Sequence, residues 1–376
     1  MMASCEKPQY EKMDDPTIPG GIEDIDISWD KLADSCTSVL TENFLDKEKG
    51  TFWATPQDVS HNSGNIYWQQ AHALDVLIYS YERIKDSDAE LAATYRDYFK
   101  RWFENDGNNY NHSHKSDGAH GGFFNAYTDD MCWIGLTLMH LASALEDNSY
   151  ADVAKAMYDD YIIPRKVNGG GLPWTNMSDK AGQNACTNSP GCLLASKLYL
   201  YTNDYKYLED ALALYDFMAT KRVSSDYMVE NPPLSYTQGT FGEAARTLYH
   251  ITGDKKYMYM AERVILYAFT SDRCVNNGIL RSEGESMDQS IFKAVLIPYG
   301  VNYCLDEDAT PYIAKRIRNL ILSNGFALYE SLNRSAYPQM YANYYWGESF
   351  KGAIASMGAQ TSGASLMENI ARMLAE

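Results

Sequence analysis

The chain has 376 residues, enough for one large domain or two ordinary ones, and its 45% of hydrophobic residues excludes a generally disordered protein. The formal net charge of −18 argues against nucleic acids and anionic membranes as partners, because binding to phosphates needs clustered Lys and Arg. The 30 Tyr and 7 Trp offer flat apolar faces that suit a neutral ligand, although helix packing uses such residues as well.

The first element in chain order is a polar tail, residues 1–25, rich in Pro and Gly. Within it, Met2-Ala3-Ser4-Cys5 is similar to the end of a bacterial lipoprotein signal with its lipidated cysteine, although no apolar h-region precedes it. This similarity predicts an exported bacterial lipoprotein, periplasmic or on the cell surface, anchored through Cys5. A chance cysteine in a tail is the alternative. No run of roughly 18 apolar residues predicts a membrane-spanning helix.

Residues 26–376 show apolar positions at i, i+3 and i+4 almost throughout, which predicts a single all-α domain. A repeat with a period of 50 residues supports this prediction, because such periods are typical of stacked or ring-closed helical hairpins. We expect the Asp in each repeat to cap the second helix of its hairpin. The repeat comprises Leu198-Tyr199, Thr202, Asp204, Tyr207 and Ala211, then Leu248-Tyr249, Thr252, Asp254, Tyr257 and Ala261, with its core also at Asp147, Tyr150 and Ala154.

The pattern predicts about twelve helices in six pairs. The first helices of the pairs are expected to begin near Trp68, Asp130, Pro190, Gln238, Met287 and Gly363, and the second helices near Ala89, Tyr150, Tyr205, Lys255 and Pro311. The twelfth, Ile27 to Phe44, would close a ring beside the C-terminal helix.

Connections within the predicted pairs are short, whereas those between pairs are long and rich in Gly, aromatic and amide residues. Loops of that length in a compact domain are usually functional. The organisation therefore predicts an (α/α)6 barrel with its active site on the long-loop face, and an open helical solenoid is the alternative. The long loops are 105–128, 168–184, 224–236, 271–285 and 333–350.

Two adjacent carboxylates, Asp129 and Asp130, lie where one of these loops turns into an apolar helix. Taken alone they could be helix-capping charges, with Thr128 as the N-cap. They could also form the pair of a retaining glycosidase, whose carboxyl groups are about 5–5.5 Å apart. The helix N-terminus would then keep one acid ionised, and burial among Trp133, Tyr127 and Phe124 would keep the other protonated.

Five segments in order resemble glycoside hydrolase family 76, the endo-α-1,6-mannanases. The first is Tyr127-Thr128-Asp129-Asp130 followed by an aromatic helix. The others are Gly169-Gly170-Gly171-Leu172-Pro173-Trp174, Asn184-Ala185-x-x-Asn188, Ser235-Tyr236-Thr237-Gln238-Gly239-Thr240-Phe241, and the Asp-x-x-x-Phe-Lys segment within Asp288 to Tyr299. One departure is that Cys186 and Cys192 stand where the family usually has small or aliphatic residues, which puts the start of the local helix in doubt.

The resemblance implies a retaining endo-α-1,6-mannanase that hydrolyses the mannan backbone of yeast and fungi, with Asp129 as nucleophile and Asp130 as acid/base. It implies no cofactor and no metal, and we expect a monomer whose partner is α-1,6-linked mannan or its oligosaccharides. Further substrate-binding candidates, each with helix capping or packing as its alternative, are Tyr127, Trp68, Trp174, Asn184, Asn188, Tyr236, Gln238 and Asp288.

Several alternatives stay open at this stage. His112, His114, Asp117 and His120 hint at a metal site but have no recognised spacing, so a solvated loop is preferred. Cys186 and Cys192 are close enough in sequence to bridge a short loop. An unsaturated glucuronyl hydrolase or a sugar epimerase would use the same kind of barrel, and a non-catalytic glycan-binding lipoprotein would use the same aromatic loops.

Overall fold

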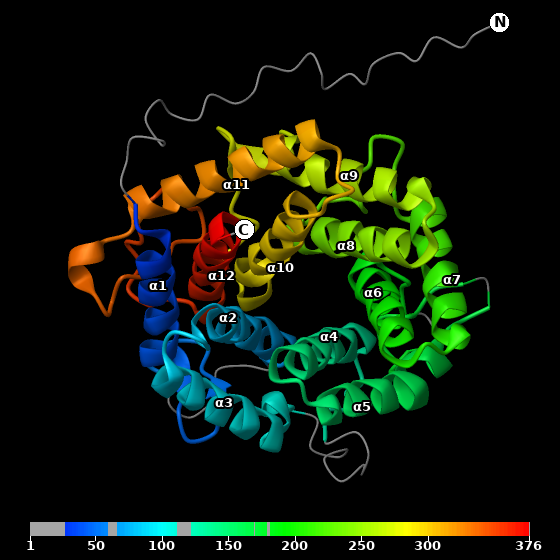
Figure 1. Ribbon diagram of the computed structural model, residues 1–376, viewed down its shortest axis with the longest axis horizontal. Coiled ribbons are helices and arrows are strands. Elements are labelled where there is room, and N and C mark those ends of the chain that lie inside the picture. The colour runs from blue at the N-terminus through cyan, green and yellow to red at the C-terminus, as the bar shows by residue number, and fades with distance from the viewer. Residues whose placement is uncertain (1–26, 59–65, 111–121, 169, 179–180, 376) are drawn as a thin grey trace, which may run out of the picture.

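A computed structural model describes residues 27–58, 66–110, 122–168, 170–178 and 181–375, and these form two concentric rings of α-helices (Figure 1). Each inner helix contacts the next, and the last contacts the first, so the inner ring is closed. The inner helices are α2 (Trp68–Ile84), α4 (Thr128–Leu145), α6 (Ala185–Thr202), α8 (Ser235–Thr252), α10 (Met287–Cys304) and α12 (Met357–Ala375). The outer helices are α1 (Trp29–Phe44), α3 (Ala89–Glu104), α5 (Asn148–Met157), α7 (Tyr205–Lys221), α9 (Lys255–Thr270) and α11 (Pro311–Ser331).

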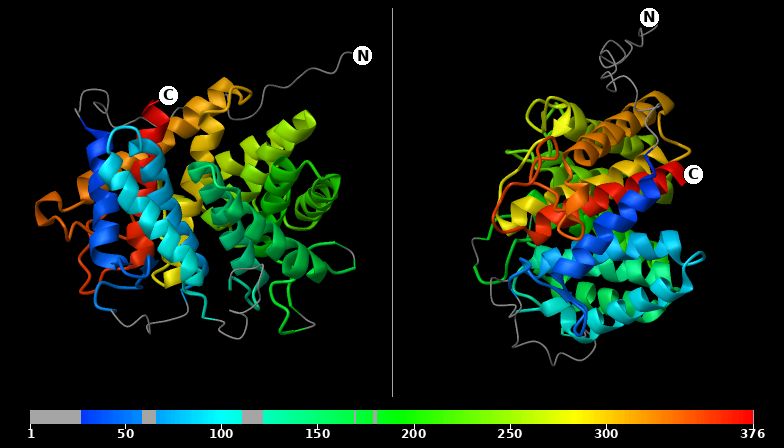
Figure 2. Two further views of the ribbon diagram at one scale, coloured as in Figure 1. Left: turned by 60° about the horizontal axis from the view of Figure 1, so that its bottom comes forward. Right: turned by 90° about the vertical axis from the view of Figure 1, so that its left-hand side faces the viewer.

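The predicted (α/α)6 barrel is confirmed, including the pairing of the N-terminal helix with the C-terminal one. Strands are limited, within the described residues, to two antiparallel two-residue pairs. These are β1 (Leu45–Asp46) with β2 (Thr51–Phe52), and β3 (Val275–Asn276) with β4 (Ile279–Leu280). Long connections gather at one end of the helices, at the lower edge of the left view in Figure 2.

Aspartates cap the second helices of four hairpins; the repeat predicted three of these caps, and Asp88 is an additional one. The carboxylates of Asp88, Asp147, Asp204 and Asp254 accept hydrogen bonds from backbone N–H groups in the first turns of α3, α5, α7 and α9. Each bond satisfies a donor that the helix itself leaves unpaired. The repeated Tyr and Ala positions of α5, α7 and α9 are buried in the core.

The ring closes through a buried ion pair. Arg83 of α2 donates from Nε to Oε2 of Glu368 in α12 at 2.8 Å, and the Glu368 side chain is fully buried. Thr37 of α1 donates its hydroxyl to the other Glu368 oxygen at 2.6 Å. These contacts join α1 and α2 to α12, so specific polar groups hold the first and last helices of the ring together.

Three helices begin at least three residues before the predicted positions. α6 begins at Ala185, five residues before Pro190, which lies inside the helix and leaves one carbonyl without its N–H partner. α8 begins at Ser235 and α12 at Met357, both before the predicted residues. In α12 the small residues permit close packing, since a Cβ added to Gly358 would collide with Oγ of Ser290 in α10.

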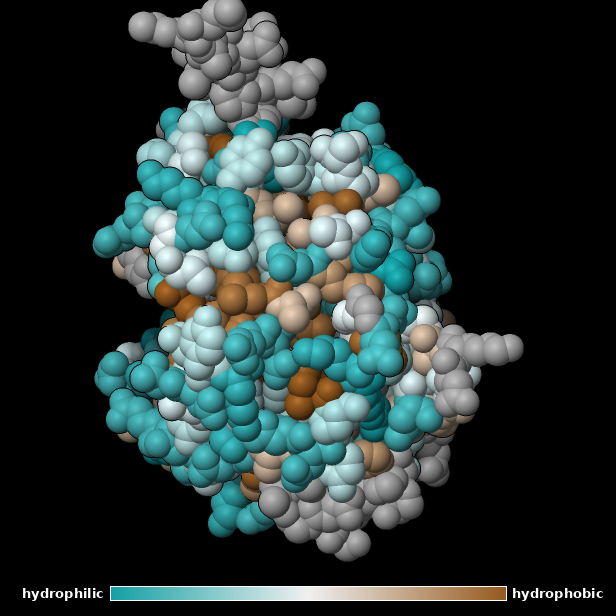
Figure 3. Space-filling view, turned by 90° about the vertical axis from the view of Figure 1, so that its right-hand side faces the viewer, coloured by the Kyte–Doolittle hydropathy of each residue, from teal (hydrophilic) through white to brown (hydrophobic). Residues whose placement is uncertain are grey.

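Several predictions about the ends and the surface have separate outcomes. Cys186 and Cys192 are free thiols, so no disulfide joins them. The predicted tail and Cys5 lie outside the described residues, as do His112, His114, Asp117 and His120. None of the described helices has the length and apolar character needed to cross a membrane. On the side of the barrel at α7, hydrophilic residues cover most of the surface and hydrophobic ones form a band across its middle (Figure 3).

Candidate active site

The first turn of α4 carries Asp129 and Asp130 at the long-loop end of the barrel. The N-cap is Tyr127, not Thr128 as the sequence predicted, and its side chain makes no capping bond. Thr128 is instead buried and accepts a hydrogen bond from Arg165 at 3.0 Å, while its backbone N–H donates to the Trp174 carbonyl at 2.8 Å. The prediction failed because this helix start is fixed by a neighbouring loop and an arginine, and not by its own hydroxyl.

Arg165 fixes the chain just before the two aspartates. Its guanidinium donates to the carbonyls of Asn125 and Ala126 at 3.1 and 2.9 Å, in addition to Thr128. The Asn125 side chain in turn accepts the backbone N–H of Tyr127 at 2.9 Å. The turn that presents the carboxylates is therefore held by polar contacts on both of its sides.

Asp129 is surrounded by hydrogen-bond donors. Its Oδ2 atom accepts the indole N–H of Trp174 at 3.0 Å and the thiol of Cys186 at 3.4 Å. Its Oδ1 atom accepts the backbone N–H of Asp130 at 3.1 Å. Three donors on one carboxyl group favour its ionised form.

Asp130 is more deeply buried than Asp129 and has a poorer set of donors. Within the part of the chain that the structure describes, its carboxyl accepts one side-chain hydrogen bond, from the Tyr110 hydroxyl at 3.3 Å. The two adjacent aspartates thus occupy different electrostatic environments, even though they line the same cavity.

The pKa values of both carboxyl groups are shifted upward by burial. Burial raises the pKa of Asp129 to about 7, against the lowering effect of Cys186, the Asp130 amide and Trp174. Burial and then the charge of Asp129 raise the pKa of Asp130 well above its ordinary value. Because Asp129 has the better donors, it loses its proton first, and the remaining proton stays on Asp130.

The cavity has a volume of about 370 Å³, within the range usual for small-ligand sites. Rings from four inner helices form its floor: Trp68 lies about 6 Å from Trp133, Tyr236 and Phe292, and Tyr236 stacks on Phe292 at 4.0 Å. The complete lining is Trp68, Tyr110, Tyr127, Asp129, Asp130, Trp133, Trp174, Asn184, Cys186, Tyr236, Asp288 and Phe292. None of these described lining residues is a Lys or Arg that could pair with an acidic ligand.

Asp288, in the first turn of α10, also lines the cavity. Its Oδ1 atom accepts the indole N–H of Trp68 at 2.8 Å and the amide of Gln69 at 2.5 Å. Both bonds use Oδ1, so among the described contacts Oδ2 remains available to a ligand hydroxyl. On the other side, the ring of Tyr127 lies 4.9 Å from that of Trp174, which is 42% exposed and forms part of the rim.

Two residues that the sequence predicted to bind the ligand, Asn188 and Gln238, do not line the cavity, and the prediction is corrected for both. Asn188 is fully buried and its amide bonds to both the N–H and the carbonyl of Leu172. Gln238 is also fully buried; it accepts the N–H of Val229 and donates to the Val264 carbonyl at 2.9 Å. Because both side-chain amides hydrogen-bond to backbone groups, Asn188 and Gln238 hold the segments that surround the cavity. Asn184, at the N-cap of α6, does line the cavity as predicted.

Four lining residues were not among the predicted ligand contacts: Tyr110, Trp133, Cys186 and Phe292. Tyr110 comes from a long loop that was predicted to be functional, and Cys186 and Phe292 lie within the matched segments. Phe124, expected beside the aspartates, is buried against Tyr161 and lies outside the lining. Sequence spacing located the segments but not the direction of each side chain.

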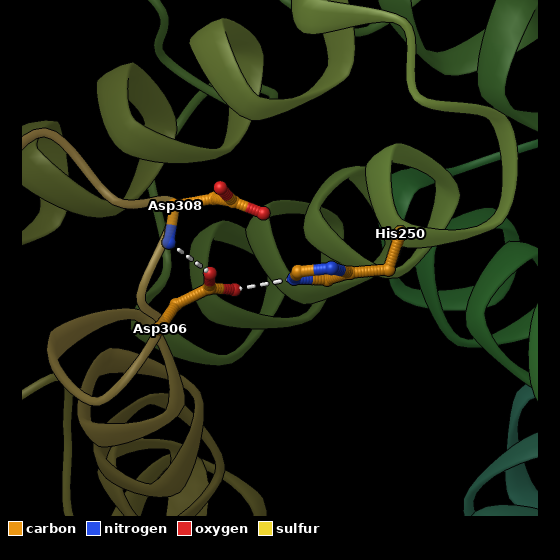
Figure 4. A group of neighbouring side chains, drawn as sticks. All are labelled: His250, Asp306 and Asp308. Carbon is orange, nitrogen blue, oxygen red and sulfur yellow. Dashed lines mark hydrogen bonds and ion pairs between the residues drawn. The ribbon is translucent and has the colours of Figure 1, made fainter.

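A separate group of titratable residues, His250, Asp306 and Asp308, lies outside the cavity lining (Figure 4). Figure 4 shows His250 and Asp306 pointing toward each other. The Nε2 atom of His250 lies 2.6 Å from Oδ2 of Asp306. Arg246 donates to the same Asp306 oxygen at 2.7 Å, and Asp308 interacts with Tyr249. Since Arg246 already supplies the positive charge, we interpret this group as an ion-pair network.

Comparison with known proteins places the chain in a family. The sequence model of Glycosyl hydrolase family 76 matches residues 28–375. The chain belongs to this family. It is therefore a glycoside hydrolase, which removes the epimerase and the non-catalytic glycan-binding protein from the alternatives. A search of curated proteins finds no significant match.

Solved structures with the same fold include family 76 enzymes. The GH76A alpha-1,6-mannanase of Salegentibacter sp. HEL1_6 is 24% identical, with a TM-score of 0.79, over 92% of this chain and all of that one. An inactive variant of that enzyme, with two consecutive aspartates replaced by alanine, is in complex with alpha-1,6-mannotetrose and gives a TM-score of 0.80 at the same identity and coverage. The family 76 mannosidase Bt3792 of Bacteroides thetaiotaomicron is 16% identical, with a TM-score of 0.70, over 93% of this chain and all of that one. These structures confirm the shared barrel.

Proposed function

We propose that this family 76 glycoside hydrolase is a retaining endo-α-1,6-mannanase that acts on the α-1,6-mannan backbone, as found in yeast and fungal mannan. The observation that carries the proposal is the adjacent pair Asp129 and Asp130 in one cavity, with different hydrogen-bond donors on each carboxyl. The Salegentibacter enzyme supports it, because variants with two consecutive aspartates replaced are inactive and form complexes with α-1,6-mannotetrose and α-1,6-mannotriose.

The two carboxyl groups fit the two roles of a retaining mechanism. Asp129, with three donors, is ionised first and acts as the nucleophile that attacks the anomeric carbon. The bond from that carbon to the O6 oxygen breaks, and Asp130 gives its proton to the leaving O6. Asp130 then takes a proton from water, whose oxygen attacks the same carbon and releases Asp129. Two displacements return the product with the original α configuration.

The cavity lining fits a neutral, hydroxylated substrate. Trp174 offers an exposed indole face at the rim, and the Asp288 Oδ2 atom can accept a bond from a mannose hydroxyl. An unsaturated glucuronyl hydrolase would need a basic residue to hold its uronate, and the described lining has none. The substrate we infer is therefore an uncharged mannose polymer.

The test is incubation of the purified protein with debranched α-1,6-mannan, followed by chromatography of the products. We expect a series of manno-oligosaccharides from the wild type, since an endo-acting enzyme cuts within the chain. Asp129→Asn and Asp130→Asn should each reduce the rate by a factor of about 10³ or more, as expected for loss of nucleophile or acid.

Asp147→Asn is the matched control, because Asp147 caps α5 outside the cavity lining and should leave the rate unchanged. A wild type that releases no oligosaccharide would refute the proposed substrate. Full activity in both cavity variants would refute the assignment of the pair.

A further inference from the structure

Cys186 is a lining residue that departs from the family pattern, and it touches Asp129 directly. Its Sγ atom lies 3.4 Å from Asp129 Oδ2, the same oxygen that accepts the Trp174 indole N–H. Cys186 belongs to the first turn of α6, whose start is held by the bond from the Ala185 N–H to Glu230 at 2.9 Å. The start of α6 therefore holds the thiol beside Asp129.

The direction of this hydrogen bond follows from the chemistry of the two groups. The Thr187 hydroxyl, 3.9 Å from the sulfur, gives its own proton to Asn184 at 2.7 Å. An ionised carboxylate can only accept, so the thiol donates to Asp129.

Taking the proposed function as its basis, we propose that Cys186 is a positioning residue that sets the basicity of Asp129 through a weak S–H donor. A thiol is a poorer donor than a hydroxyl. It therefore stabilises the ionised Asp129 enough to hold its orientation, but leaves the carboxylate more basic and more nucleophilic than a serine would.

The surroundings of Cys186 support a donor role. Burial, then the charge of Asp129, raise the pKa of the Cys186 thiol well above its ordinary value. The sulfur therefore keeps its proton at the pH where Asp129 is ionised. The titratable groups that face Asp129 are Asp130 and Cys132 on α4, Cys186 on α6, and Tyr236 on α8. Tyr110 and Asp288 face Asp130 and act on Asp129 through it.

The experiment compares Cys186→Ala and Cys186→Ser with the wild type in two readouts. The first is the pH dependence of kcat/KM on α-1,6-mannan. The second is direct titration of the Asp129 carboxyl by NMR of protein labelled with ¹³C at aspartate carboxyls, with the signal assigned by its loss in Asp129→Asn. The second readout does not require turnover.

Loss of the donor in Cys186→Ala should move the acid limb of the kcat/KM profile to higher pH by about 0.5–1 unit, and the pKa of Asp129 should rise by the same amount. The reason is that a hydrogen bond to the charged form lowers a carboxyl pKa. The stronger donor in Cys186→Ser should lower both. Cys192→Ala is the matched control, because Cys192 lies on the same helix, is buried, and donates its thiol to the Ala211 carbonyl. It should leave both readouts unchanged.

Opposite shifts in the Ala and Ser variants support the proposal. It is overturned if neither variant shifts the Asp129 titration, or if both shift it in the same direction, because the second result would indicate packing and not donor strength. A wild type inactive on mannan whose Asp129 still titrates differently in the two variants would refute the proposed function and leave this inference standing.

Discussion

Asn188→Ala should destabilise the protein strongly, because the Asn188 side chain on α6 bonds to the loop at Leu172 and does not line the cavity. The Asn188 Oδ1 atom accepts the Leu172 N–H at 2.6 Å, and Nδ2 donates to the Leu172 carbonyl at 3.0 Å. Both residues are fully buried. Truncation leaves two buried backbone groups unpaired, at about 1–3 kcal/mol each, so the free energy of unfolding should fall by about 2–6 kcal/mol.

Chemical denaturation of the purified variant measures this loss directly. Asn184→Ala is the control, because Asn184 lines the cavity four residues earlier and its side chain bonds to Thr187 and not to the Leu172 loop. We expect Asn184→Ala to change stability by less than about 1 kcal/mol and to weaken substrate binding instead. An Asn188→Ala protein with unchanged stability and a higher KM would refute the structural assignment and restore the original prediction.

Three further predictions concern the carboxylates and the ring closure. Trp174→Phe keeps an aromatic face but removes the 3.0 Å hydrogen bond to Asp129. We therefore expect kcat/KM to fall about tenfold and the acid limb of its pH profile to move to higher pH. An unshifted acid limb would contradict the role of Trp174 as a donor to Asp129. Asp130→Asn should raise Tm by about 2–4 °C at pH 8, since the raised pKa of Asp130 makes its ionisation unfavourable in the folded state, and calorimetry should show the gain disappearing toward pH 4. Arg83→Met leaves Glu368 buried without its cation and should cost about 3–5 kcal/mol in denaturant titrations; a loss below about 1 kcal/mol would show that the ring closes without this pair.

The helical ring could be predicted because its signals are local. The Asp caps at Asp147, Asp204 and Asp254 recur in sequence, and they occupy equivalent positions in α5, α7 and α9. Helix starts inside the ring were less predictable. The inner helices are buried nearly all round, so the amphipathic pattern that marks a helix start on the surface is weak there.

The candidate site was only partly predictable, for a physical reason. Asp129, Asp130, Trp68, Trp174, Tyr127, Asn184, Tyr236 and Asp288 do line one cavity. Asn188 and Gln238 belong to the same matched segments, but an amide serves equally well to bind a ligand hydroxyl and a loop carbonyl. Only the direction of the side chain separates these uses, and sequence spacing does not carry it. The contact of Cys186 with Asp129 depends on two different helices and was equally hidden.

The stereochemistry of hydrolysis tests the roles of Asp129 and Asp130 most directly, and ¹H NMR of the anomeric protons during hydrolysis of an α-1,6-manno-oligosaccharide measures it. A double displacement through Asp129 predicts that the first product of the wild type carries the α-anomer, which then mutarotates. Asp129→Asn should form product far more slowly than the wild type. First appearance of the β-anomer would contradict the double displacement through Asp129. Undiminished hydrolysis by Asp129→Asn would contradict its role as nucleophile.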